Sequence, residues 1–204
     1  TEQALGDTLQ RARELAPPMP VCIQLSHAGR KASSAAPWQG GQLLSPAQGG
    51  WQPVGPSALP QLPTEALPTA LTLEQMNEIR DAFVTAAQRA QRIGIDAIEL
   101  HAAHGYLLHQ FLSPLANQRD DDYGGSLANR MRFPLEVLAA VRQVFDGPVG
   151  VRLSAIDWVE GGLDVAQTAE FARQLKALGC AFIHVSTAGI SPLQKITLGP
   201  GYQV

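Results

Sequence analysis

Apolar residues follow two spacings along this chain, and the two spacings predict helices and strands in turn. Helical spacing, three or four residues apart, runs through 5–16, 72–94, 126–145 and 164–179. Short apolar runs of the length of buried strands fall at 21–25, 95–100, 148–153 and 181–185. Because each strand but the first directly follows a helix of similar pattern, the order predicts a parallel sheet covered by helices.

The predicted helices carry recognisable end signals. Thr72 and Gln75 form a capping-box pattern at the start of one helix, and Asp164 is a good N-cap for the last. Pro134 lies inside 126–145, where proline removes a backbone donor. We therefore expect Pro134 either to kink that helix or to mark its true start.

Polar residues gather where three of the strands end, at 24–30, 99–106 and 152–158. A (β/α)8 barrel keeps its chemistry at the carboxyl ends of its strands. A doubly wound sheet would give the same alternation, but it usually carries a Gly-rich phosphate turn after its first strand, and none follows 21–25. The sequence therefore predicts an α/β fold that is part of a TIM (β/α)8 barrel, with four of the eight strands.

A long segment without periodicity, 28–71, is rich in Pro, Gly and Ser. A loop of this length inside a compact domain is usually functional, although an ordinary surface excursion remains an alternative. Its tryptophans, Trp38 and Trp51, together with Trp158, are expected to serve packing rather than catalysis.

The densest group of reactive side chains runs from Glu99 to Tyr106. Strand alternation places Glu99 and His101 on one side, the barrel interior, with His104 and Tyr106 on the loop above. Two imidazoles and a phenol around one pocket can hold a substrate oxygen and deliver a proton. Two alternatives stay open: histidines satisfied at a strand end, or zinc or iron held by the acid and both histidines, with His109 as a fourth candidate.

Composition narrows the class of protein. The chain has 204 residues, 45% of them apolar, and a net charge of −3, which suits one domain with a core and gives no attraction to nucleic acid or anionic membranes. It has no apolar stretch of about 20 residues and no signal peptide. Two lone cysteines, Cys22 and Cys180, favour a reduced, cytoplasmic setting. Because position 1 is not Met and no helix is predicted after 198–204, we expect the chain to be truncated at both ends.

Four motifs resemble the Old Yellow Enzyme family, a group of flavin-dependent ene-reductases. The run HAAHGYLLHQFLSP at 101–114 is similar to the family's substrate-binding signature, and NQRDDDYGGSLANRMRF at 117–133 continues the likeness. QLSHAGRK at 24–31 and VRLSA at 151–155 are further matches. Because both pocket positions, His101 and His104, are histidine, the likeness is greatest to the bacterial xenobiotic-reductase branch.

The resemblance implies that residues 1–204 are the central part of a single FMN-binding (β/α)8 barrel domain, roughly strands 3–6 with their helices. It also implies hydride transfer from NADH or NADPH through FMN to enones, enals, maleimides or nitro compounds. The FMN phosphate site belongs to the family's last two strands, which this chain is expected to lack. Family members often pair, so a homo-oligomer is expected of a complete protein.

The resemblance also assigns roles to individual side chains. Gln24 is expected to hydrogen-bond the flavin ring edge, and Arg152 to lie beside its N1/O2 edge as a counter-charge. His101 and His104 are expected to hold the carbonyl or nitro oxygen of the substrate. Tyr106 matches the tyrosine that protonates carbon in many members. In this branch a tyrosine nearer the N-terminus, outside this chain, is the slightly favoured donor.

Other polar residues are expected to have structural roles. His27 and Arg30 should hold the loop after the first strand, and His184 should be a satisfied barrel histidine near the cofactor. A further set should tie down the loop after 101–114: Asn117, Arg119, Asp121 and Asn129.

The sequence thus predicts an FMN-dependent NAD(P)H ene-reductase that uses small-molecule substrates and no nucleic acid or membrane. Two other hypotheses remain at this point. One is a metal-dependent barrel hydrolase built on Glu99, His101 and His104, and the other is an inactive fragment that neither binds cofactor nor folds stably alone.

Overall fold

A four-stranded parallel sheet forms the centre of the protein, in a computed structural model that describes residues 1–196 and 199. The strands lie in the order β1-β4-β5-β6. Their bounds are Cys22–Leu25 for β1, Ala97–Ala102 for β4, Val149–Ser154 for β5 and Ile183–Ser186 for β6. The predicted α/β class and the parallel, partial-barrel arrangement are confirmed. The expectation about the chain's ending, at 198–204, lies outside the described residues except for 199.

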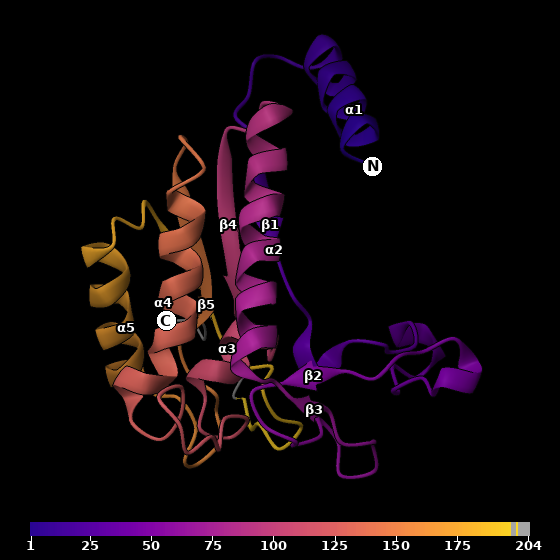
Figure 1. Ribbon diagram of the computed structural model, residues 1–204, viewed down its shortest axis with the longest axis vertical. Helices are drawn as coiled ribbons and strands as arrows, with labels where there is room; N and C mark the ends of the chain where they lie inside the picture. The colour runs from indigo at the N-terminus through magenta and orange to yellow at the C-terminus, as the bar shows by residue number, and fades with distance from the viewer. Residues whose placement is uncertain (197–198, 200–204) are drawn as a thin grey trace.

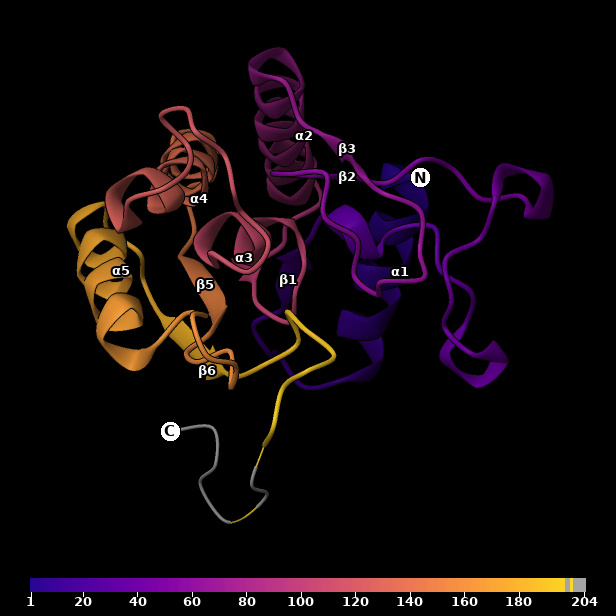
Figure 2. The same ribbon diagram turned by 90° about the horizontal axis from the view of Figure 1, so that it is seen from below.

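Three long helices cover one face of this sheet, as Figures 1 and 2 show. They are α2 (Leu73–Arg92), α4 (Leu127–Arg142) and α5 (Val165–Ala177). Apolar strand residues on this face, such as Ile98, Leu100, Val151 and Leu153, are at most 2% exposed and form the core with the helices. Burial of this apolar area is the main stabilising contribution to the fold.

The helix starts follow the predicted caps, with one exception. Thr72 and Gln75 make the reciprocal capping box of α2, and the Asp164 side chain accepts the amide of Gln167 at the start of α5. Pro134 lies inside α4, which begins earlier because the side chain of Ser126 caps it. The expectation that Pro134 could mark the true start of this helix was wrong, because the Ser126 cap fixes the start upstream.

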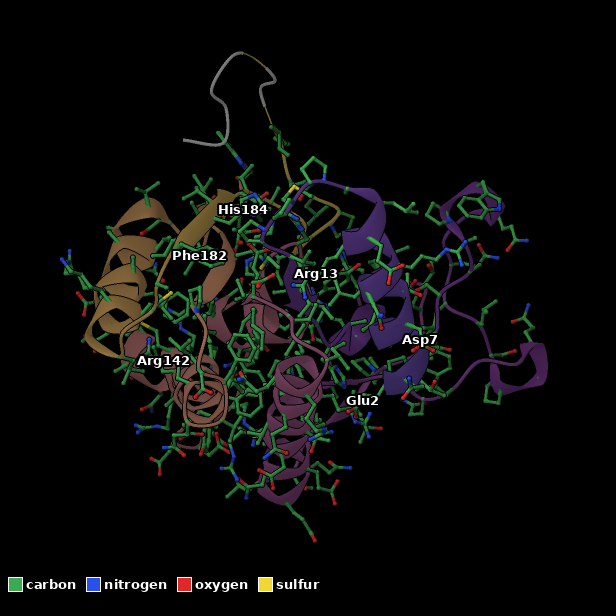
Figure 3. All side chains as sticks on the ribbon, turned by 90° about the horizontal axis from the view of Figure 1, so that it is seen from above. Glu2, Asp7, Arg13, Arg142, Phe182 and His184 are labelled. Carbon is green, nitrogen blue, oxygen red and sulfur yellow. The ribbon has the colours of Figure 1, made fainter. Side chains whose placement is uncertain are left out.

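The first helix, α1 (Glu2–Leu15), lies beyond the opposite end of the sheet from the β2 and β3 loops (Figure 1). Glu2 pairs with Arg92 of α2 at 2.8 Å, and Arg13 pairs with Asp96 at 2.6 Å. Figure 3 labels Glu2 and Arg13 along this helix. Since only Leu9 of α1 is buried, these exposed ion pairs orient the helix more than they stabilise it.

Segment 28–71 is mostly irregular, as predicted, but it contains short elements that periodicity did not show. These are three single-turn 3-10 helices at Gly29–Lys31, Pro37–Gln39 and Pro46–Gln48, and a two-residue parallel pair of β2 (Val54–Gly55) with β3 (Thr69–Ala70). Part of the segment projects from the body of the molecule (Figure 2).

The tryptophans divide into two kinds. Trp38 is 86% and Trp51 is 61% exposed, so the prediction that they pack was wrong for both within the described residues. Both belong to segment 28–71, in which Leu71 is the one described residue of the buried hydrophobic core. Trp158 is half-buried, and its indole donates to Thr187 Oγ1 at 2.5 Å, which fits the predicted structural role.

A short helix, α3 (Leu107–Leu112), follows β4 and was not predicted. All of its residues are buried. A helix of under two turns that is buried on every side has no amphipathic period, so the pattern of polar and apolar positions could not show it.

The other face of the sheet carries polar side chains in rows that cross the strands. Aligned residues of parallel strands point to the same face. The rows are Gln24 with Glu99, then His101 with Arg152 and His184, then Ser154 with Ser186. This is the face that becomes the interior when a sheet of this kind closes into a barrel.

The open sheet leads to a prediction about residues 1–204 expressed alone. Among the described residues, β1 and β6 each have a neighbour on one side only, and apolar residues in and directly before β6 are exposed: Phe182 and Ile183 at 37% and Val185 at 41%. Unpaired edges and exposed apolar strands promote aggregation. We expect the isolated chain to aggregate or to bind FMN only weakly. Gel filtration of the refolded chain with FMN tests this, and a monomer that retains stoichiometric FMN would contradict it.

Candidate functional site

Glu99 links two neighbouring polar side chains on the barrel-interior face. Its Oε1 accepts a hydrogen bond of 2.5 Å from Gln24 Nε2, and its Oε2 lies 3.0 Å from His184 Nδ1. One N–H of the Gln24 amide is used by Glu99, which leaves its second N–H to donate to a ligand and its oxygen to accept from one. The carboxylate also places a proton on His184 Nδ1, so His184 is the satisfied barrel histidine that the sequence predicted; Figure 3 labels it on β6.

His101, His104 and Tyr106 form one aromatic cluster at the carboxyl end of β4. The ring centroids of His101 and His104 are 5.1 Å apart, and those of His101 and Tyr106 are 4.8 Å apart, both edge to face. His101 belongs to β4 and is 4% exposed, while the two others lie on the turn that follows and are half-buried. The structure therefore brings together the three side chains that the sequence singled out.

Each histidine of the cluster has one ring nitrogen engaged by the protein. His101 Nδ1 accepts the amide of Ala103 at 3.1 Å, and His104 Nε2 lies 2.7 Å from Ser186 Oγ. Burial, together with the neighbouring His104 and Arg152 charges, lowers the pKa of His101 to about 4. Burial and the Arg152 charge likewise lower the pKa of His104 to about 4. Both rings are therefore neutral at pH 7, and each has one nitrogen free to meet a ligand.

The turn that carries His104 depends on an unusual backbone. His104 and Gly105 have φ of 56° and 75°, in the left-handed region. A Cβ at Gly105 would lie 2.2 Å from the carbonyl oxygen of Gly189, so only glycine fits this approach of two loops. Lys31 Nζ donates to the His104 carbonyl at 2.8 Å and to the Gly189 carbonyl at 2.5 Å, while Ser154 Oγ accepts the His104 amide at 3.0 Å. Loops from three strands are thus held in contact.

Arg152 lies between His101 and His184 on the same face, and among the described residues its charge has no partner. Its Nε is buried without a hydrogen bond, and no ion pair joins it to an acid within the described part of the chain. Arg130 Nε is also unpaired, but its other nitrogens bond the Leu112 carbonyl and Gln167. A buried, unpaired guanidinium nitrogen is costly, and, unlike in Arg130, no nitrogen of Arg152 bonds another described residue, so Arg152 is suited to an anionic or acceptor-rich partner.

These residues fit the polar edge of a flavin ring. Gln24 presents an amide oxygen to an N–H donor, and on the same face of the sheet Arg152 presents an unpaired cation. A flavin ring offers such a donor, and its N1 edge carries negative charge after reduction. The described residues therefore suit the FMN ring that the resemblance implied.

The rival metal site is not supported by the arrangement of these side chains. Among the residues that the structure describes, no three or more His, Cys, Asp or Glu are placed to hold a metal ion. Glu99 is shared by Gln24 and His184, while His109 Nε2 bonds Asp157 at 2.9 Å. The hydrolase hypothesis built on these ligands is therefore set aside.

Most of the predicted supporting residues hold loops as expected. Arg30 donates to the Ile190 carbonyl at 2.6 Å, and His27 Nδ1 accepts the Gly29 amide at 3.0 Å. The contacts of the later loop are Asn117 with the carbonyls of Phe111 and Tyr123, and Arg119 with Asp121 and the carbonyls of Pro56 and Leu71. Asn129 differs, because it lies within α4 and its side chain accepts from Arg132 instead of tying down the loop.

Apart from naming His109 as a possible metal ligand, sequence reasoning gave no role to several residues that build the site. Ser154 and Ser186 end neighbouring strands in register and hold His104 from two sides. Lys31 and the buried pair His109 and Asp157 fix the turns behind the cluster. The position of the serines at two strand ends was the one available signal, since the other contacts join residues that are far apart in sequence.

Comparison with known proteins agrees with this geometry. Residues 19–197 match the family described as NADH:flavin oxidoreductase / NADH oxidase. The chain is 44% identical to an NADPH dehydrogenase of Listeria innocua over 182 residues, 89% of this chain and 49% of that protein. It is also 44% identical to an NADH:flavin oxidoreductase of Gibberella zeae over 202 residues, 90% of this chain and 49% of that protein. The chain spans about half the length of these curated relatives.

Solved structures show the same likeness. Morphinone reductase in complex with tetrahydroNAD superposes with a TM-score of 0.72 at 33% identity, over 90% of this chain and 52% of that one. The old yellow enzyme homologue from Zymomonas mobilis gives a TM-score of 0.65 at 29% identity, over 80% of this chain and 46% of that one.

The fold is part of a parallel α/β barrel, and the polar site lies at the carboxyl ends of its strands. The chain belongs to the NADH:flavin oxidoreductase / NADH oxidase family, which confirms the resemblance to Old Yellow Enzymes. Within the described residues, no helix combines the length and the apolar character that crossing a membrane requires. Both cysteines are free, as expected, and the cytoplasmic setting stays a prediction.

Proposed function

We propose that this chain supplies the substrate pocket and part of the flavin-ring contact of an FMN-dependent NAD(P)H ene-reductase. The observation that carries the proposal is the cluster of two neutral histidines and a tyrosine beside Arg152, whose Nε is buried and unpaired. Because the chain spans half the length of its relatives, "complete protein" below means this sequence joined to the remaining strands of the barrel.

Gln24 and Arg152 are proposed to hold the cofactor's ring edge. FMN, when bound, takes hydride from NADH or NADPH and passes it to an electron-poor carbon or to a nitro group. Glu99 keeps the Gln24 amide oriented with its oxygen outward, and Arg152 supplies a fixed positive charge for the ring edge. The cation finds in this ring the partner that the described residues do not give it.

His101 and His104 are proposed to hold the substrate's activating oxygen. As neutral rings, each donates an N–H to the oxygen of an enone, enal or nitro group. These bonds strengthen as negative charge develops on that oxygen. Tyr106 is proposed as the acid that protonates the substrate carbon next to the activating group. The ring centroids of Tyr106 and His101 are 4.8 Å apart, which supports this role, whereas the sequence slightly favoured a tyrosine outside this chain as the donor. A homo-oligomer remains a prediction.

The histidine pair gives a binding prediction for the complete protein. His101→Ala and His104→Ala should each weaken the binding of a phenol such as 4-hydroxybenzaldehyde, whose oxygen accepts a hydrogen bond from each histidine. The expected loss is about 1–3 kcal/mol each, or about 5- to 150-fold in Kd. Titration followed by FMN absorbance measures it. Unchanged affinity, with loss of a tightly bound metal from the variants, would instead favour a metalloenzyme.

The same histidines predict how stability depends on pH. Their folded pKa of about 4 lies below the ordinary 6.5, so the unfolded chain binds protons more readily than the folded one. The stabilising effect of keeping these rings neutral is complete above pH 6.5 and is lost as pH falls from 6.5 toward 4. Urea unfolding at several pH values measures the free energy of unfolding. As pH falls from 6.5 toward 4, this free energy should decline less in the double variant His101→Gln, His104→Gln than in the wild type. An equal dependence of the free energy of unfolding on pH in both proteins would refute the lowered pKa values.

A further inference from the structure

A hydrogen-bonded network with no solvent exposure lies directly behind the substrate-binding turn. His109 Nε2 is 2.9 Å from Asp157 Oδ1, and both side chains are 0% exposed. Ser113 Oγ and the Leu163 amide donate to Asp157 Oδ2 at 2.6 and 2.7 Å. Burial alone would raise the pKa of Asp157, but the hydrogen bonds from His109, Ser113 and Leu163 outweigh it, so the pKa lies below its ordinary value. Asp157 is therefore an ionised acceptor.

The other nitrogen of His109 faces the turn. His109 Nδ1 accepts the backbone amide of Gly105 at 2.9 Å, so the single ring proton is on Nε2, toward Asp157. The Gly105 carbonyl accepts from Gln110 Nε2 at 2.7 Å. Both polar backbone groups of Gly105 are thus held by adjacent side chains of α3.

Gly105 is the residue whose conformation decides where its neighbours point. It lies between His104 and Tyr106 and adopts a left-handed φ of 75°. Glycine alone does not enforce this value, because it adopts other φ angles at little cost. A fixed acceptor for its buried amide does select one conformation, since any other leaves that amide unpaired.

We propose that His109 is a positioning residue for substrate binding: its Nδ1 fixes the Gly105 amide and so sets the relative placement of His104 and Tyr106. Asp157 serves this role by holding the proton on the far nitrogen, which leaves Nδ1 as an acceptor. The inference rests on the proposed function, because it concerns the same pocket. It assigns the setting of that pocket to a side chain that contacts neither the substrate nor the cofactor.

Two isosteric variants of the complete protein separate the two bonds of His109. In His109→Asn the amide oxygen can take the place of Nδ1 and keep the bond to Gly105, but the bond to Asp157 is lost. In His109→Gln the amide nitrogen can take the place of Nε2 and keep Asp157, but the acceptor for Gly105 is lost. Because a buried charge loses a partner in the first variant, we expect His109→Asn to be the less stable of the two.

Ligand affinity should follow the opposite order from stability. We expect His109→Gln to weaken the binding of 4-hydroxybenzaldehyde by about 10-fold, the scale of one lost hydrogen bond. His109→Asn should keep nearly wild-type affinity. Ser113→Ala, which removes a bond to Asp157 but not the contact with the turn, is the matched control and should leave affinity unchanged. Affinity that falls in step with urea stability, with His109→Asn the weaker binder, would overturn the proposal.

A ligand-free measurement keeps this test separate from the proposed function. Amide hydrogen exchange at Gly105 should accelerate in His109→Gln and stay slow in His109→Asn, whether or not the wild type binds the phenol. If neither variant folds, the ring nitrogen shifts of wild-type His109 decide, since a protonated Nδ1 excludes the bond to Gly105. A wild type that binds no phenol, with the exchange pattern as expected, would sink the proposed function and leave the role of His109 in the turn standing.

Discussion

Replacing Tyr106 by phenylalanine in the complete protein should slow the reaction with an enone by ~100-fold while leaving the reaction with NAD(P)H unchanged. The change removes one hydroxyl and keeps the ring, whose centroid lies 4.8 Å from that of the His101 ring. If that hydroxyl delivers the proton, its loss affects the step in which carbon is protonated and no step before it. Anaerobic stopped-flow measurement of the two half-reactions separates these steps.

Tyr123→Phe provides the matched control for this experiment. The Tyr123 hydroxyl lies 3.2 Å from Glu136 Oε1, so its removal deletes a phenol oxygen outside the aromatic cluster. Both half-reactions should proceed at wild-type rates in that variant. A modest slowing in Tyr106→Phe, seen mainly as weaker substrate binding, would indicate that the proton donor is a residue outside this chain. Slowing confined to the NAD(P)H half-reaction would remove Tyr106 from substrate chemistry altogether.

Replacing Arg152 by methionine should weaken FMN binding and lower the reduction potential of the bound cofactor. The structure leaves the Arg152 Nε buried without a partner, so the proposed function makes it the counter-charge of the reduced ring. Methionine keeps much of the length and removes the charge. A potentiometric titration with a reference dye and a fluorescence titration with FMN measure the two effects.

Arg152→Lys is the control, because it keeps a positive charge but loses the planar fork. The reduction potential of FMN in Arg152→Lys should lie closer to the wild-type value than it does in Arg152→Met. Both variants should bind a phenol at His101 and His104 nearly as the wild type does. An unchanged midpoint potential in Arg152→Met would contradict the assigned role.

The sequence predicted the main elements of the fold because each has a periodic apolar face and several have a cap. Thr72 and Asp164 are examples in which one residue fixed a helix start. It also placed His101, His104 and Tyr106 together, since strand alternation and a short turn leave little freedom. The short helix α3 escaped notice because it is buried on all sides.

What the sequence could not predict are contacts between residues that are far apart in the chain. The bonds of Lys31 to the carbonyls of His104 and Gly189 depend on how three loops meet in space. The orientation of Gln24 depends on Glu99, which lies on the neighbouring strand. The exposure of Trp38 likewise depends on a segment that leaves the body of the molecule, and composition alone suggests the opposite.

The most direct test of the account is one turnover in the complete protein. The purified protein should contain bound FMN, lose its yellow colour with NADPH or NADH under anaerobic conditions, and regain it on addition of 2-cyclohexen-1-one with formation of the saturated ketone. The double variant His101→Ala, His104→Ala should still react with the nicotinamide but recover its colour far more slowly with the enone. A purified protein without flavin, or one whose reduced form does not react with the enone, would contradict the account.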